Sequence, residues 1–208
     1  MVSSKNRQHL LLVVTVVALF LAAADARRRP VHLRLYMHDI IGGPEQTAIH
    51  LIRNAGPPHK SLKGAYFGDT MAIDDLVTEG PGINSSSVVG RAQGTYMLSS
   101  QHEEVLVADV TVVLTDGPYD GSTFVVAGRV GIYDDRTELA VVGGTGQLRR
   151  ATGHVFWRTA MVVSDVYIVV ELVVHVCASE HCCSWPAMGH LRSGSFLLFL
   201  RKGKGPIP

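Results

Sequence analysis

Cysteine is nearly absent from this chain of 208 residues, which limits what its fold can use. All three cysteines, Cys177, Cys182 and Cys183, lie near the C-terminus, and the segment 27–176 has none. A domain built from that segment therefore cannot depend on a disulfide, even in an oxidising compartment. The odd count leaves at least one thiol without an intramolecular partner, and the spacing lacks the Cys-x-x-Cys pair typical of structural zinc sites.

Several functional signatures are also missing. The formal net charge is only +1, so nothing indicates the basic footprint of a nucleic-acid-binding protein. The chain has no Gly-x-Ser-x-Gly elbow of a serine hydrolase and no paired-histidine motif of a metalloprotease. The run Gly143-Gly144-Thr145-Gly146 lacks the lysine of a phosphate-binding loop, and no helical pattern follows it, which favours a turn between strands.

A long, nearly continuous apolar run occurs near the N-terminus. Leu10–Ala24 is apolar except for Thr15, follows the basic residues Lys5 and Arg7, and leads into Ala24-Asp25-Ala26, a small-x-small cleavage pattern. The run is shorter than the roughly 20 residues of a membrane span, so a membrane anchor is the less favoured alternative. The sequence thus predicts a signal peptide over residues 1–26 and a secreted protein that is free of the membrane after cleavage.

Alternating apolar and polar residues predict an all-β fold. In Val31–Ile40, for example, Val31, Leu33, Leu35 and Met37 share one face of a strand. Nine strand-like segments, which we take to form about eight strands, span Val31–Ile40, Thr47–Arg53, Ala65–Ile73, Val88–Leu98, Val105–Thr115, Ser122–Val130, Leu139–Val142, His154–Ala160 and Met161–Val176. With no convincing amphipathic helix between them, such strands either stack as a sandwich or close as a barrel, and closure removes the exposed edges.

The strand Val88–Leu98 and the loop before it each contain a feature that leads to a specific structural prediction. Gly90 and Gly94 lie inside the strand, where glycine usually marks a bulge, a barrel corner or a close backbone approach. Asn84-Ser85-Ser86 is an N-glycosylation sequon in a polar loop, so Asn84 is a predicted glycosylation site. An unmodified loop asparagine is the alternative.

Acidic residues are the candidates for chemistry. Asp39 ends an alternating strand, and a carboxyl group in an apolar barrel mouth has a raised pKa, which suits a general acid. Asp74 and Asp75 are more simply interpreted as residues that fasten a turn through backbone hydrogen bonds. Arg91 is a candidate partner for one of these acids, in an ion pair that only holds the barrel together.

Six short motifs resemble the plant dirigent family, in its order and spacing from about Val31 to about Val176. They are Tyr36-Met37-His38-Asp39-Ile40, Phe67-Gly68-Asp69, Asp74-Asp75, Thr78-Glu79-Gly80-Pro81, Gly90-Arg91-Ala92-Gln93-Gly94 and Val141-Val142-Gly143-Gly144-Thr145-Gly146. The resemblance implies an eight-stranded antiparallel β-barrel, of the dirigent and allene oxide cyclase-like kind, over residues 27–176. Residues 177–208 resemble nothing in the family and are expected to form an atypical, disordered, cysteine-containing tail.

The resemblance also implies a function. Dirigent proteins orient phenoxy radicals of a monolignol such as coniferyl alcohol, so that coupling gives an optically active lignan. A separate oxidase or peroxidase supplies the radicals, and no cofactor or metal is needed. The expected protein is a stereo-directing homo-oligomer, a dimer or a trimer, of the extracellular space or apoplast, in which an acid helps a quinone methide to cyclise. The alternative is a non-catalytic extracellular binding or defence-related wall protein on the same barrel.

The resemblance assigns site residues as well. Asp39 falls on a pocket position of the family and is the expected general acid. The expected substrate-binding residues are Tyr36, Asp74, Glu79, Arg91 and Tyr96.

Two positions depart from the lignan-forming members. Those members carry an acid shortly after the equivalent of Ala127-Gly128 and an arginine just before the equivalent of Glu138. Here the two positions read Val130 and Thr137. Asp135 and Arg136 lie close by but out of register, and on a strand a shift of one residue points to the other face. The resemblance thus leaves the substrate and the stereochemistry open.

Overall fold

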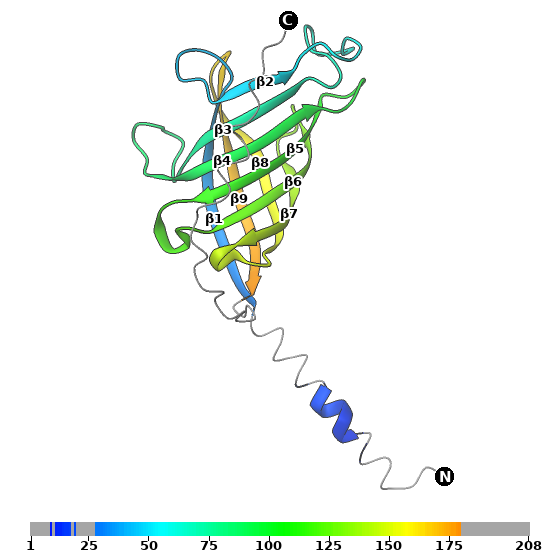
Figure 1. Ribbon diagram of the computed structural model, residues 1–208, viewed down its shortest axis with the longest axis vertical. Coiled ribbons are helices and arrows are strands. Elements are labelled where there is room, and N and C mark those ends of the chain that lie inside the picture. The colour runs from blue at the N-terminus through cyan, green and yellow to red at the C-terminus, as the bar shows by residue number, and fades with distance from the viewer. Residues whose placement is uncertain (1–8, 10, 18, 20–27, 180–208) are drawn as a thin grey trace, which may run out of the picture.

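The computed structural model describes residues 9, 11–17, 19 and 28–179, and the last range forms the folded β-domain (Figure 1). Most of the predicted signal peptide and most of the predicted tail thus lie outside the described residues, as do Cys182 and Cys183. Within the part of the chain that is described, no helix is long and apolar enough to cross a membrane.

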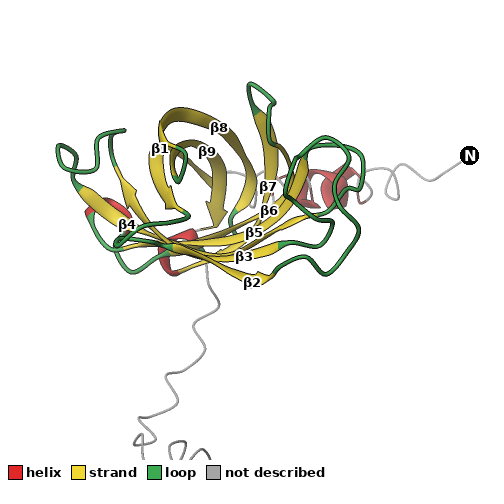
Figure 2. Cartoon of the chain, turned by 90° about the horizontal axis from the view of Figure 1, so that it is seen from above, coloured by secondary structure: helices red, strands yellow, loops and turns green. Residues whose placement is uncertain are grey.

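The described residues contain nine strands in one antiparallel sheet. The strands are β1 (Arg28–Ile40), β2 (Ala48–Ile52), β3 (Thr70–Thr78), β4 (Val88–Leu98), β5 (Val105–Leu114), β6 (Thr123–Gly131), β7 (Thr137–Thr145), β8 (Thr152–Ser164) and β9 (Tyr167–Ser179). Their order is β1-β9-β8-β7-β6-β5-β4-β3-β2, and β1 also pairs with β3. The β1–β3 pairing closes eight strands into a barrel, with β2 attached outside the ring, which is visible from above in Figure 2. The predicted eight-stranded antiparallel barrel is confirmed, and the sandwich is excluded.

The closing seam between β1 and β3 is short. It consists of the three pairs Tyr36↔Thr78, Met37↔Val77 and His38↔Leu76. Further along β3, β2 replaces β1 as the neighbour. The segment between β1 and β2 crosses this junction, where the backbone nitrogen of Asp74 donates to the carbonyl of Thr47 across 3.0 Å. Two strands therefore share one edge of β3, and the change of partner falls beside Asp74 and Asp75.

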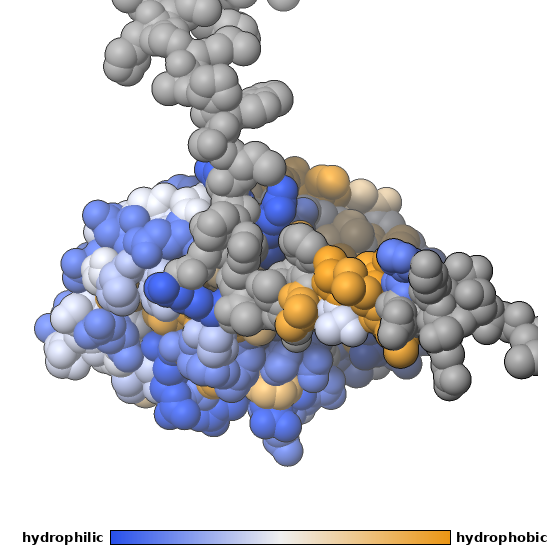
Figure 3. Space-filling model, turned by 90° about the horizontal axis from the view of Figure 1, so that it is seen from below, coloured by the Kyte–Doolittle hydropathy of each residue, from blue (hydrophilic) through white to orange (hydrophobic). Residues whose placement is uncertain are grey.

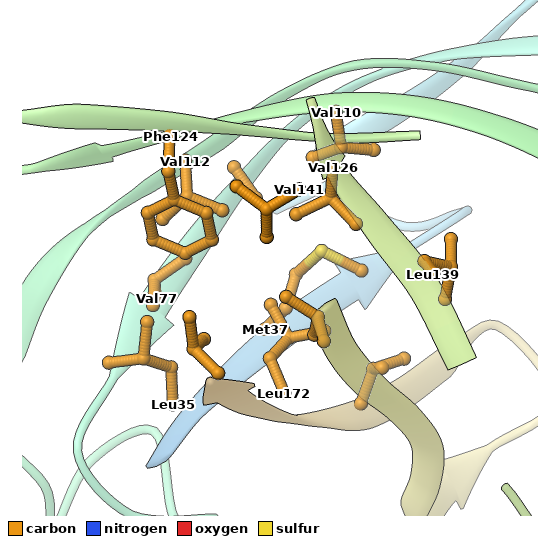
Figure 4. Close-up of a cluster of buried hydrophobic side chains, with 14 of the residues drawn as sticks. Leu35, Met37, Val77, Val110, Val112, Phe124, Val126, Leu139, Val141 and Leu172 are labelled. Carbon is orange, nitrogen blue, oxygen red and sulfur yellow. The ribbon is translucent and has the colours of Figure 1, made fainter. Parts of the chain in front are cut away.

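Every second side chain along each strand points inward, and these side chains fill the barrel. Leu35 and Met37 meet Val77, Phe124 and Leu172 in the interior, as Figure 4 shows. Full burial of such a side chain stabilises the fold by roughly 1.5–3 kcal/mol. The surface of the barrel seen from below in Figure 3 is largely hydrophilic, as expected when alternate residues point outward.

Gly90 and Gly94 occupy interior positions of β4, where the neighbouring strand comes very close. A Cβ atom built on Gly90 would lie 2.0 Å from the carbonyl oxygen of Val113, and one on Gly94 would lie 2.1 Å from that of Asp109. Any larger residue would push β4 away from β5. Of the three alternatives expected at these glycines, the structure shows a close backbone approach at both, and the β3–β4 register also shifts beside Gly90.

Several strand boundaries differ from the prediction. β3 begins at Thr70 rather than Ala65, because the carboxylate of Asp69 accepts hydrogen bonds from the backbone nitrogens of Asn54 and Tyr66, at 2.7 and 2.9 Å. These bonds hold the preceding residues in turns. Residues 143–145 belong to β7, and the turn starts only at Gly146.

The last hairpin also differs. β8 continues to Ser164, so the chain reverses at residues 165–166 rather than after Ala160. β9 runs past Val176 to Ser179 and therefore includes Cys177.

Candidate functional site

A cavity of about 160 Å³ opens at the end of the barrel where β1 ends and β9 begins. Its wall is mostly apolar, with Leu106, Val130, Trp157, Ile168 and Val170 among the lining residues. Asp39 and Tyr96 are polar residues of this wall, and Asp134, Arg158 and Asp165 also line the cavity. The arrangement can hold an aromatic ring against apolar side chains while a polar group of the ligand reaches Asp39.

Asp39 lies inside the barrel because it continues the inward parity of Leu35 and Met37 along β1. Only 5% of the residue is exposed. Its Oδ2 accepts a hydrogen bond of 3.1 Å from the hydroxyl of Tyr96, while its Oδ1 is buried without a hydrogen-bond partner. Burial raises the pKa of Asp39 to about 6, and the Tyr96 hydroxyl opposes this rise. The Asp39 carboxyl group therefore keeps its proton under mildly acidic conditions.

Tyr96 reaches Asp39 from β4, where it shares the inward parity of Ala92 and Leu98. Burial, and next the charge of Asp39, raise the pKa of Tyr96 above its ordinary value. Its hydroxyl consequently keeps its proton and acts as a lasting donor to Asp39.

A second acid, Asp75, lies behind this site. It is fully buried, at 0% exposure, and shares the inward parity of Ile73 and Val77 on β3. The hydroxyl of Thr47 donates to its Oδ1 across 2.5 Å, whereas its Oδ2 has no partner. Burial, and next the charge of Asp39, raise the pKa of Asp75 to about 8. The interpretation of Asp75 as a turn residue is wrong, because it sits in mid-strand and bonds a side chain.

Comparison with known proteins identifies the family. The family model described as dirigent-like protein matches residues 30–177. The chain belongs to the dirigent family. It is 36% identical over 170 residues to dirigent protein 1 of Arabidopsis thaliana, covering 80% of this chain and 91% of that protein.

Pterocarpan synthases are among the similar members of the family. Pterocarpan synthase 1 of Glycine max is 35% identical over 148 residues, covering 69% of this chain and 77% of that protein. A solved structure of a pterocarpan synthase dirigent protein superposes with a TM-score of 0.66 at 31% identity, covering 74% of this chain and 91% of that one.

The other residues expected to bind substrate in this dirigent protein are not brought to the cavity. Tyr36 points outward from β1 and donates to Oε1 of Glu171 across 3.1 Å. Asp74 and Arg91 lie on the outer face, where Nε of Arg91 donates to Oδ1 of Asp74 across 2.6 Å and holds the pKa of that carboxyl below its usual range. This pair fastens β3 to β4. Glu79 follows β3 and lines a smaller pocket of about 120 Å³ beside Leu33, near the other end of the barrel.

A buried acid on the outer face was missed from the sequence. Glu171 of β9 is only 2% exposed and is held by Arg158 and by Tyr36. Burial alone would raise the pKa of Glu171, but these two partners keep it below the ordinary value. This network ties β1, β8 and β9 together, and through Arg158 it also reaches the cavity wall.

The two positions that depart from the lignan-forming members lie on the inner side. Val130 is buried in the cavity wall. Thr137 opens β7, paired with Trp157 and in phase with the buried Leu139. Arg136 turns away, with its guanidinium 4.2 Å from the centre of the Phe156 ring on the outer face. Arg136 thus lies on the opposite face of the sheet from Thr137.

Two remaining features concern ligands and modification. Within residues 28–179 and the described N-terminal residues, no group of three or more His, Cys, Asp or Glu side chains could hold a metal ion. Activity without a cofactor or metal stays a prediction. Asn84 is exposed in the turn between β3 and β4, and its glycosylation also stays a prediction.

Proposed function

We propose that this dirigent protein controls the stereochemistry of addition to a phenolic quinone methide, with Asp39 as the general acid. The observation that carries the proposal is the Asp39 carboxyl, buried in an apolar cavity with one oxygen unpaired and a pKa of about 6. A group of this kind donates a proton well near its own pKa, and the apolar wall fixes which face of a bound ring is exposed.

The chemical step needs no electron acceptor. A hydroxyl group adds to the exocyclic carbon of the quinone methide, and a carbon–oxygen bond forms. The electron pair of the exocyclic double bond moves through the ring to the quinone oxygen, which takes the proton of Asp39 and becomes a phenol. The proton of the attacking hydroxyl then returns to the Asp39 carboxylate, so that the acid is restored.

Two substrate classes use this step. In the first, a separate oxidase or peroxidase makes two monolignol radicals, for example from coniferyl alcohol. The radicals couple to a bis-quinone methide, which cyclises to an optically active lignan. In the second, a single phenolic molecule forms a quinone methide and closes a ring on itself, in line with the names of the pterocarpan synthases that the chain resembles.

The size of the cavity favours the second class. An apolar cavity of about 150 Å³ holds one benzene molecule, so about 160 Å³ matches one aromatic ring with the rest of the ligand in the open mouth. Val130 also supplies an apolar wall where lignan-forming members carry an acid. Ring closure within one molecule is therefore the main proposal, and monolignol coupling is the second candidate, supported by Asp39 at its family position.

A two-substrate comparison tests the proposal. The secreted protein is mixed either with coniferyl alcohol and a one-electron oxidant, or with an ortho-hydroxybenzyl alcohol that carries a tethered phenol. Products are separated on a chiral column beside controls without protein. We expect an enantiomeric excess in the ring-closure reaction and a smaller one in the coupling reaction. Racemic products in both would reject the proposal in favour of a non-catalytic binding or defence-related wall protein.

The cellular setting is proposed on sequence grounds. Secretion to the apoplast would place the protein where oxidases generate phenolic radicals. N-terminal sequencing of the secreted chain tests this, with Arg27 expected as the first residue. Self-association as a dimer or trimer is tested by light scattering on the same material.

A further inference from the structure

Asp39 and Asp75 lie one residue beyond the last pair of the closing seam, one on each strand, and the charge of Asp39 acts on Asp75. The β1–β3 ladder stops at His38↔Leu76, and the next position in the same register would pair Asp39 with Asp75. Both side chains point into the barrel, and both are at least 95% buried. Two carboxyl groups directly opposite on neighbouring strands repel when both are ionised, so this placement disfavours loss of both protons.

The hydrogen bonds around the two acids do not engage every carboxyl oxygen, so a proton can be held there. Tyr96 supplies a donor to Asp39 and Thr47 supplies one to Asp75. Oδ1 of Asp39 and Oδ2 of Asp75 are nevertheless buried and without a partner. An unpaired buried acceptor is unfavourable, and protonation turns a carboxyl oxygen from an acceptor into a donor.

The neighbouring charged side chains do not take over the role of that proton, which is to offset the negative charge of the two acids. Arg91 is a cation that acts on Asp75, but it lies on the outer face in its ion pair with Asp74, whose own charge opposes it. The other titratable or charged side chains lining the cavity are Asp134, Arg158, Asp165 and Tyr167.

We propose that Asp75 is a positioning residue that holds a proton for Asp39, so that the two carboxyl groups titrate as one pair and an acid persists at the site above the pH at which Asp39 alone would lose it. This inference rests on the proposed role of Asp39. Thr47 helps to hold this pair in place. Its hydroxyl donates a hydrogen bond to Asp75 and accepts one of 3.1 Å from the backbone nitrogen of Ile40, which ties Asp75 to the end of β1.

The pair can be observed without any substrate. Aspartate-selective carboxyl ¹³C NMR is recorded against pH for the wild type, Asp39→Asn and Asp75→Asn, with the outward-facing Asp109→Asn as the matched control. In the wild type and in the control, we expect two titration steps with raised pKa values, one near pH 6 and one near pH 8. Asp75→Asn should lose the upper step. In Asp39→Asn the step of Asp75 should move to lower pH, because no carboxylate faces it. Independent titration of the two groups, or an upper step that survives in Asp75→Asn, would overturn the pair.

The pH dependence of activity separates a proton-holding role from a structural one. Asn keeps an acceptor for Thr47, so Asp75→Asn removes the proton while preserving the bond. The rate of stereoselective product formation should match the wild type near pH 5 and fall at least about tenfold below it by pH 8, because pH 8 is well above the Asp39 pKa of about 6 and the acid form of Asp39 alone decreases tenfold per pH unit. A loss of the same size at every pH, or no loss, would reject the role. If the paired titration is observed but Asp39→Asn keeps full stereocontrol, the proposed function fails and the pair stands.

Discussion

The hydroxyl of Tyr96 donates to Oδ2 of Asp39 across 3.1 Å inside the barrel, from β4 to β1. This bond stabilises the ionised form of Asp39 and so lowers its pKa against the effect of burial. The acidity of the site is thus set by two opposing influences, one from the apolar wall and one from a single hydroxyl group.

Removing that hydroxyl should extend the acid form of Asp39 to higher pH. In Tyr96→Phe we expect the alkaline limb of the pH–rate profile to move up by about half a unit to one unit, since a hydrogen bond of this kind contributes about 1 kcal/mol. Tyr133→Phe is the matched control, because Tyr133 is 75% exposed. A downward shift, or equal profiles for both variants, would contradict this description of the site.

The outer ion pair should matter little for chemistry. Arg91→Ala removes the contact with Asp74, which is exposed to solvent, so the free energy of unfolding should fall by at most about 1 kcal/mol. The product ratio should stay as in the wild type because neither residue lines the cavity. Arg129→Ala, which breaks the exposed Arg129–Glu103 pair, is the control. If Arg91→Ala changed the enantiomeric excess and Arg129→Ala did not, Arg91 would have to be counted among the substrate-binding residues.

Two substitutions test why lignan formation is disfavoured. Val130→Asp places an acid in the cavity wall, and alone it should destabilise the fold by roughly 1–3 kcal/mol, because Val130 is buried. Adding Thr137→Arg should recover part of this loss and raise the enantiomeric excess in coniferyl alcohol coupling. Chiral chromatography of the single and double variants decides the matter, and a racemic product from a folded double variant would remove these positions as the explanation.

Stability should depend on pH through Asp75. A carboxyl group whose pKa is higher in the folded chain than in the unfolded one stabilises the fold at low pH, and this contribution is lost as pH rises through the folded pKa. The relevant window runs from about pH 4 to about pH 8. Between pH 5 and pH 8 the wild type should therefore lose roughly 2–4 kcal/mol more than Asp75→Asn. Urea unfolding at both pH values measures this difference, and equal losses would contradict the raised pKa.

Alternation along the strands was enough to predict much of the barrel and part of the site. The inward parity of Leu33, Leu35 and Met37 continues to Asp39, so its place inside could be predicted. The same rule puts Tyr36 outside and places Asp75, between Ile73 and Val77, inside. The family resemblance nevertheless assigned Tyr36 to substrate binding, and Asp75 was interpreted as a turn residue because the predicted strand ended at Ile73, whereas β3 runs to Thr78.

Other features depend on contacts that the sequence does not reveal. The β1–β3 seam brings together residues about 40 positions apart, and it leaves Asp39 and Asp75 one position beyond its last pair. The start of β3 depends on which backbone groups the Asp69 carboxylate meets, one of them 15 residues away. Neither arrangement leaves a local pattern of propensity or periodicity.

The most direct measurement is the enantiomeric excess of the ring-closure product formed by the wild type, Asp39→Asn and the control Asp109→Asn near pH 6. Asn has nearly the same shape as Asp but has no acidic proton to donate. We expect stereoselective product from the wild type and the control, and a racemic product at the rate of the reaction without protein from Asp39→Asn. A folded Asp39→Asn variant that keeps the wild-type enantiomeric excess and rate would contradict the role of Asp39 as general acid.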